Sequence, residues 1–109
     1  MTTLKIWIDN LSDGEPVEGV VFGEMGWGDY HASIVPDYAG QPKGEVLSYE
    51  AALRWLTYEF DDGYGSPECN AVTAWTKSWV ITVIQYDGSP RPIRLPRNPI
   101  SYLPTMPGE

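Results

Sequence analysis

A catalytic cysteine in this chain would have to pair Cys69 with His31, because the sequence contains one residue of each type. A thiol becomes a useful nucleophile when a neighbouring base or cation stabilises its thiolate. Neither position belongs to a motif that is typical of a thiol enzyme. An inert thiol in a loop or in the core is the simpler interpretation. We therefore predict no catalytic residue and a non-enzymatic protein.

Three carboxylates surround two glycines in the segment from Asp61 to Glu68. Calcium ions favour such oxygen-rich turns, but the spacing does not match the twelve-residue loop of an EF-hand. The alternative is a solvated helix end, partly neutralised by Lys77 or by the three arginines of the C-terminal third. We predict no metal site and no cofactor, and a cation bound to this segment stays open as the alternative.

The glycine-rich stretch over residues 19–28 does not form a phosphate-binding loop, because no GxGxxG pattern opens a helix there and no Lys-Ser/Thr pair follows. The glycines instead indicate strand bulges and a tight turn with Trp27 at its tip. An exposed tryptophan between glycines is a candidate anchor for a partner protein. The alternative is that Trp27 folds back into the core.

The net charge of −8 is distributed unevenly along the chain. Residues 1–69 contain thirteen acidic and three basic residues, whereas residues 70–109 contain two acidic and four basic residues. Such an excess of carboxylates repels phosphate backbones, so direct nucleic-acid binding is disfavoured. The acidity either serves solubility or forms a face that meets a basic partner protein. The candidate partner-binding residues are Glu15, Glu18, Glu24, Trp27, Asp29, Glu59, Asp61 and Asp62.

Length and composition indicate one folded domain that needs no disulfide. A chain of 109 residues, 42% of them hydrophobic, is long enough to bury a core. A single cysteine excludes an intrachain disulfide, and no apolar stretch approaches the length of a leader or of a membrane span. We expect a protein of the reducing cytoplasm that makes no membrane contact.

The clearest structural signal is a β-hairpin closed by Asp87 and Gly88. A β-branched and aromatic run precedes this pair, which is typical of a two-residue type I′ turn. The turn places Pro90 and Pro92 at non-hydrogen-bonded positions, where each lacks an N–H on the side away from its partner. The returning strand is therefore predicted to lie at an edge of the sheet. The two strands are expected over residues 79–86 and 89–95.

One helix is predicted from Ser48 to Gly63. Ser48 is a suitable N-cap, and Gly63 is a suitable C-cap glycine. Leu53, Leu56 and Phe60 recur at helical spacing and should form the buried stripe. Carboxylates in the last turn would face the negative end of the helix dipole, which costs about 0.3–1 kcal/mol each without a nearby cation. These carboxylates are Glu59, Asp61 and Asp62.

The remaining segments complete an α+β domain. Strands are expected over residues 4–9, 17–23 and 29–35, and a loop over residues 63–74. The order is then β-β-β-α-β-β, which corresponds to an antiparallel sheet covered by one helix. Residues 1–95 form this domain. Residues 96–109 contain four prolines and are expected to form an extended, proline-rich tail.

The chain resembles the small uncharacterised proteins of bacteriophages, especially those that infect actinobacteria. The resemblance lies in its acidic, glycine- and tryptophan-rich composition and in three short sequence segments, Trp75-Thr76, Tyr86-Asp87-Gly88 and Pro96-Arg97-Asn98-Pro99. It implies an intracellular protein that acts by binding, such as an inhibitor whose acidic surface occupies the basic, nucleic-acid-binding site of a host protein. The alternative is a phage structural or assembly protein that docks through its edge strand and its proline-rich tail.

Overall fold

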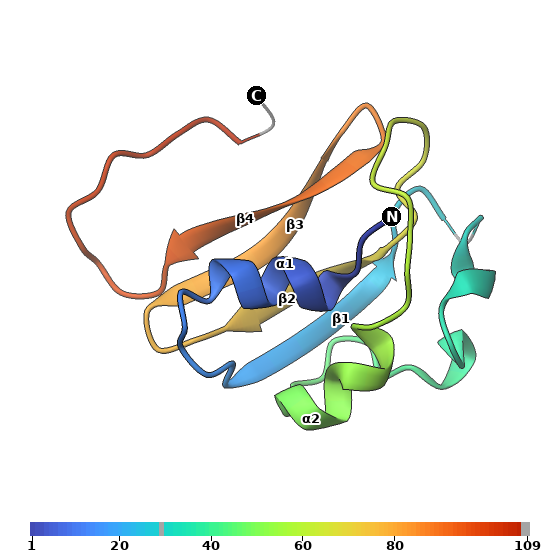
Figure 1. Ribbon diagram of the computed structural model, residues 1–109, viewed down its shortest axis with the longest axis horizontal. Helices are drawn as coiled ribbons and strands as arrows, with labels where there is room; N and C mark the ends of the chain where they lie inside the picture. Colours follow the sequence, from blue (N-terminus) through green and yellow to red (C-terminus); the bar gives the residue numbers. More distant parts are fainter. Residues whose placement is uncertain (29, 108–109) are drawn as a thin grey trace.

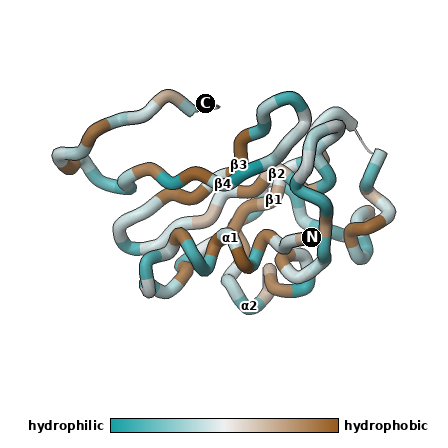
Figure 2. Tube along the Cα trace, turned by 45° about the horizontal axis from the view of Figure 1, so that its top comes forward, coloured by the Kyte–Doolittle hydropathy of each residue, from teal (hydrophilic) through white to brown (hydrophobic). Residues whose placement is uncertain are grey.

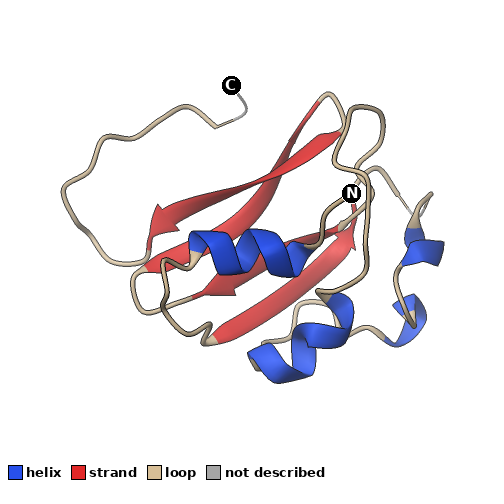
Figure 3. Cartoon of the chain, in the orientation of Figure 1, coloured by secondary structure: helices blue, strands red, loops and turns tan. Residues whose placement is uncertain are grey.

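A four-stranded antiparallel sheet, in the order β1-β2-β3-β4, forms the centre of the computed structural model, which describes residues 1–28 and 30–107. Helix α1 lies across one face of the sheet, and α2 lies beside β1 (Figure 1; Figure 3). This arrangement confirms the predicted α+β class with an antiparallel sheet. The elements are α1 (Leu4–Leu11), β1 (Gly19–Met25), α2 (Tyr49–Ala52), β2 (Asn70–Trp75), β3 (Trp79–Tyr86) and β4 (Ser89–Pro96), with short 3₁₀ helices at Ala32–Ile34, Tyr38–Gly40 and Leu53–Trp55.

The predicted hairpin is confirmed in both position and register. Tyr86 faces Ser89, and each following pair is the one expected, through to Val80 opposite Leu95. Asp87 and Gly88 have φ values of 51° and 80°, as a type I′ turn requires. Gly88 has a second constraint, because a Cβ atom at this position would lie 1.4 Å from the carbonyl oxygen of Gly65.

Both edges of the sheet are closed to a further strand. β4 is an edge strand, as predicted. At four of its positions the backbone N–H would point away from β3, and three of these positions are prolines, which have no N–H. These are Pro90, Pro92 and Pro96. At the other edge, Val20 exchanges backbone hydrogen bonds of 2.9 and 2.8 Å with Leu47, and the Gly44 amide donates to the Phe22 carbonyl.

The strand predicted over residues 4–9 is wrong, because this segment forms α1. The Thr3 side chain caps the helix by accepting a hydrogen bond from the Ile6 amide at 3.1 Å. Leu4 and Ile8 are buried on one face, whereas Ile6 is half exposed. Residues four positions apart share a face in a helix as well as in a strand, so the alternating pattern did not distinguish the two.

The second helix begins as predicted but ends much earlier. The Ser48 hydroxyl caps it by accepting from the Ala51 amide, and the helical segment ends at Trp55 instead of Gly63. The chain then extends, and Phe60 forms an antiparallel bridge with Thr2, with two hydrogen bonds of 3.0 Å. Pairing with the N-terminal residues therefore replaces the last two turns of the expected helix.

Two other expectations from the sequence need correction. The segment predicted as a strand over residues 29–35 contains a 3₁₀ helix at Ala32–Ile34, and Asp29 itself lies outside the described residues. The loop expected over residues 63–74 ends earlier, because β2 begins at Asn70. β2 lies between β1 and β3 in the sheet.

The hydrophobic core lies between the sheet and the helices. Val20, Phe22 and Ile81 point from the strands toward the helices, and each is at most 1% exposed. Leu56 and Phe60 are fully buried, as predicted, although Phe60 is not helical. Two edge-to-face ring contacts, Trp7 with Phe60 and Phe22 with Trp55, join this layer. We call the covered side of the sheet the inner face and the opposite side the outer face.

The chain after β4 runs away from the sheet as an extended segment (Figure 1). Residues 97–107 form no helix or strand, and Figure 2 shows hydrophobic stretches in this tail as well as along the strands. Its large apolar side chains do not pack back on the domain but are exposed. They are Ile100, Tyr102, Leu103 and Met106. None of the helices in the described part of the chain is long and apolar enough to cross a membrane.

Candidate functional site

Three segments meet at one end of the sheet: the turn after β1, the loop over residues 61–68 and the β3–β4 turn. The Gly65 amide donates to the Asp87 carbonyl at 3.3 Å, and the Ser89 hydroxyl donates to the Asp62 carbonyl at 2.9 Å. A Cβ atom on Gly26 would lie 2.5 Å from Pro67, so the turn after β1 touches the same loop. We call the charged and aromatic residues that these three segments carry the acidic end surface. It consists of Glu24, Trp27, Asp61, Asp62, Tyr64, Glu68, Tyr86 and Asp87.

A buried polar cluster fixes the 61–68 loop at both of its ends. Tyr58 precedes the loop and Asn70 follows it, and the Tyr58 hydroxyl accepts from the Asn70 amide at 3.0 Å while donating to the Asn70 side chain at 2.9 Å. The Asn70 side-chain amide also donates to Gly23 in β1 and pairs reciprocally with the Gln41 amide. Every polar atom of the Asn70 side chain thus has a partner, as a buried amide requires.

The carboxylates of the acidic end surface are not paired with basic side chains. Among residues 1–28 and 30–107 the ion pairs join Lys5 to Asp9, Arg54 to Asp37 and Arg97 to Glu18. Inside the loop the Gly63 amide donates to the Asp61 carboxylate at 2.8 Å, and the Asp61 amide donates to Glu68 at 3.1 Å. These bonds shape the loop, and both Asp61 and Asp62 remain exposed.

The same surface exposes three large aromatic side chains. Trp27 is 57% exposed, Tyr64 76% and Tyr86 60%. Trp27 occupies the turn after β1 with a φ of 58°, and its exposure shows that it does not return to the core. Exposed aromatic rings between charged groups are typical of surfaces that bind another protein.

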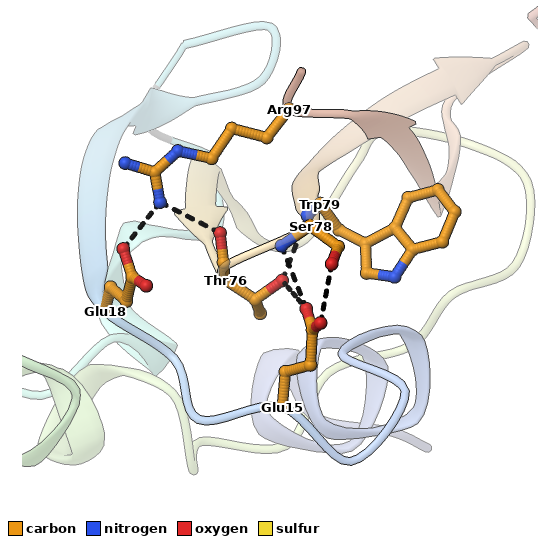
Figure 4. Close-up of polar contacts among 6 residues, drawn as sticks. All are labelled: Glu15, Glu18, Thr76, Ser78, Trp79 and Arg97. Carbon is orange, nitrogen blue, oxygen red and sulfur yellow. Dashed lines mark hydrogen bonds and ion pairs between the residues drawn. The ribbon is translucent and has the colours of Figure 1, made fainter. Parts of the chain in front are cut away.

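Glu15, one of the predicted contact residues, lies at the opposite end of the sheet, where it has a structural partner (Figure 4). Its carboxylate accepts hydrogen bonds from the Ser78 hydroxyl at 2.6 Å, the Thr76 hydroxyl at 2.7 Å and the Ser78 amide at 3.0 Å. The Ser78 and Thr76 hydroxyls hold the pKa of Glu15 below its usual value. The carboxylate thereby ties the loop before β1 to the β2–β3 turn.

Glu18 lies at that same far end and is paired with Arg97 at 2.5 Å (Figure 4). The Arg97 guanidinium also donates to the Thr76 carbonyl at 2.9 Å, and the Arg97 amide donates to the Ser78 carbonyl. Glu18 and Arg97 therefore fix the point where the tail leaves the domain. The structure brings together Glu24, Trp27, Asp61 and Asp62, but not Glu15 or Glu18.

Two predicted contact residues remain, Asp29 and Glu59. Asp29 lies outside the described residues. Glu59 is exposed in the segment that bridges to Thr2, directly before the 61–68 loop. Sequence reasoning missed Asp87, Tyr64 and Tyr86, although Asp87 and Tyr86 belong to the hairpin that it identified. Only the contact between the hairpin turn and the distant Gly65 reveals them as part of this surface.

Cys69 and His31 do not form a reactive pair. Cys69 is 2% exposed, and burial raises the pKa of its thiol to about 12, the opposite of what activation requires. The His31 ring nitrogen Nε2 lies 2.6 Å from the Ser66 hydroxyl, a contact that holds the segment after Trp27 against the 61–68 loop. Within the described residues, no three Asp, Glu, His or Cys side chains converge closely enough to hold a metal ion.

Comparison with models of protein families, with curated proteins and with solved structures finds no match to this chain. The functional inference therefore depends on the geometry of its own residues.

Proposed function

We propose that this chain is a non-enzymatic interaction protein that binds a basic partner protein through the acidic end surface. The observation that supports this proposal is the convergence of carboxylates and exposed aromatic rings from three segments distant in sequence. A surface that serves solubility alone does not need its charges to lie in one place, and such a surface exposes few tryptophan and tyrosine side chains.

The two kinds of side chain have different roles in this proposal. Glu24, Asp61, Asp62 and Asp87 attract a basic surface over a distance of about a Debye length, which raises the rate of association. Trp27 and its tyrosine neighbours supply apolar contact area once the partner has docked. Glu15 and Glu18 take no part, because their carboxylates are already engaged within the fold.

The proposed target is a host protein of the cytoplasm whose basic site ordinarily holds nucleic acid. The resemblance to bacteriophage proteins supports a host target, and the unpaired carboxylates support competition with a phosphate backbone. The alternative role, in assembly of a phage particle, is supported by the exposed apolar side chains of the tail. The edge strand adds no support to it, because the prolines of β4 remove the N–H groups that a docking strand needs.

Capture of partners from an actinobacterial lysate at low and high salt tests the proposal, with two charge-reversed variants of equal net charge. The test variant is Asp61→Lys with Asp62→Lys. The control is Glu45→Lys with Glu50→Lys, at exposed positions away from the surface. We expect one basic protein that is released by salt, retained by the control and lost by the test variant. Equal retention by both variants would contradict the proposal.

A further inference from the structure

The outer face of the sheet is apolar and uncovered. Side chains alternate along each strand, so the neighbours of the buried residues Val20, Ala74 and Ile81 point to the side away from the helices. The apolar members of this outward set are Val21, Trp75, Val80, Ile84, Ile93 and Leu95. Leu95 is 45% exposed, and the others are partly exposed rather than buried.

Charge is nearly absent from this face, although the chain carries a net charge of −8. Among the paired positions of the four strands, Arg91 is the one charged residue that points outward. Two copies of the chain could therefore approach through their outer faces without bringing carboxylates together. A strongly charged partner, in contrast, would find no counter-charge there.

The tail has the same character as the outer face and begins at its border. Residues 98–107 carry no charge, and they expose Ile100, Tyr102, Leu103 and Met106. Arg97 fixes the start of the tail beside a groove of 240 Å³ on the outer side of the sheet. Gly19, Val46 and Trp75 line this groove together with the ion-paired Glu18 and Arg97. Gly19 lacks the side chain that would fill the space between Val46 and Trp75.

The sizes of the two surfaces fit a dimer. Four strands about 4.8 Å apart and about 20 Å long present a face of roughly 400 Å², whereas a stable interface buries about 800 Å² of each partner. Ten tail residues in a polyproline-like conformation extend about 31 Å, enough to cross the face. The outer face and the tail of each copy together thus supply the buried area that a stable dimer needs, whereas the face alone or the tail alone does not.

We propose that two copies of this chain associate with two-fold symmetry, each laying residues 98–107 across the outer face of the other. Such an exchange buries the same two surfaces twice, as an isologous dimer requires. It leaves the acidic end surface free, so the dimer presents two copies of it. This proposal does not depend on the partner proposed above.

Complementation between two variants tests the exchange, with the mass in solution measured over a range of protein concentrations. The face variant carries Leu95→Lys, with Ile93→Lys added as a stronger version, and the tail variant carries Ile100→Asp with Leu103→Asp. Far-UV circular dichroism verifies that each variant is folded. If the chain with both Leu95→Lys and Ile93→Lys does not fold, Leu95→Lys alone serves as the face variant. The control is Asp61→Lys with Asp62→Lys, which changes the acidic end surface only.

We expect the full chain and the control to form a species of twice the 12.2 kDa chain mass, and each variant alone to dimerise at least tenfold more weakly. A mixture of the two variants should dimerise more tightly than either variant alone, because the intact tail of one fits the intact face of the other, but less tightly than the wild-type chain, which makes two such contacts. A wild-type chain that stays monomeric, as it would with its tail folded on its own face, overturns the proposal. A dimer that the tail variant leaves intact, or a mixture without rescue, overturns it as well.

Discussion

At the scale of single residues, some carboxylates of this chain tie distant segments together, whereas others form only local hydrogen bonds or none, and sequence alone does not separate the two groups. Glu15 and Asp61 look equivalent in sequence, since both are acidic and lie next to turn residues. Glu15 is structural because its carboxylate accepts hydrogen bonds from the hydroxyls of Thr76 and Ser78 in the β2–β3 turn, sixty-one and sixty-three residues away. We call this set of hydrogen bonds the Glu15 latch. Such a contact is set by the tertiary fold, so no local pattern predicts it.

The Glu15 latch makes the folded state less stable at acidic pH. The pKa of Glu15 is lowered on folding, so its contribution is present above the usual carboxyl pKa of about 4.5 and is lost as the pH falls through the folded value. We expect Glu15→Gln to lower the melting temperature at neutral pH and to have a smaller effect at pH 3. Thermal unfolding at the two pH values measures it. Glu45→Gln, at an exposed position, is the control, and an equal effect of both changes at neutral pH would refute the latch.

At the scale of elements, the sequence specified the hairpin fully because its signals are local. The Asp87-Gly88 turn and the two prolines each constrain the same register, and the structure shows that register. The N-terminal helix was mistaken for a strand because the spacing of Leu4 and Ile8 suits both elements. The end of α2 was misplaced because the pairing of Phe60 with Thr2 joins segments fifty-eight residues apart, where propensity has no influence.

Gly88 links this local element to the acidic end surface. Its φ of 80° is strained for any L-residue, and its Cβ would overlap the Gly65 carbonyl. We expect Gly88→Ala to lower the free energy of unfolding by more than about 1 kcal/mol, and to displace the 61–68 loop from the hairpin. Denaturant unfolding and amide exchange at Gly65 measure the two effects. Asp87→Asn is the control, because asparagine adopts the same turn conformation as aspartate. A Gly88→Ala variant that is as stable as this control would contradict the packing of Gly88 against Gly65.

At the scale of the whole molecule, the carboxylates and the aliphatic area lie on different surfaces. The acidic end surface gathers carboxylates from three segments, and the outer face with the tail is almost uncharged. The sequence indicated the first-half acidity and left open whether Trp27 is exposed, but it grouped Glu15 and Glu18 with the wrong end of the sheet. Glu15 and Glu18 precede β1, whereas Glu24 and Trp27 lie at or beyond its end, so the length of this strand separates them.

The salt dependence of association with the purified partner decides whether the acidic end surface binds that partner. We expect the association rate of the wild-type chain to fall steeply as ionic strength rises, since exposed charges are screened beyond about 10 Å at 0.1 M salt. Asp61→Lys with Asp62→Lys should associate at least tenfold more slowly at low salt and show a flat dependence, while Glu45→Lys with Glu50→Lys stays close to wild type. Rates and salt slopes that are the same for the two double variants would contradict a localised acidic binding surface.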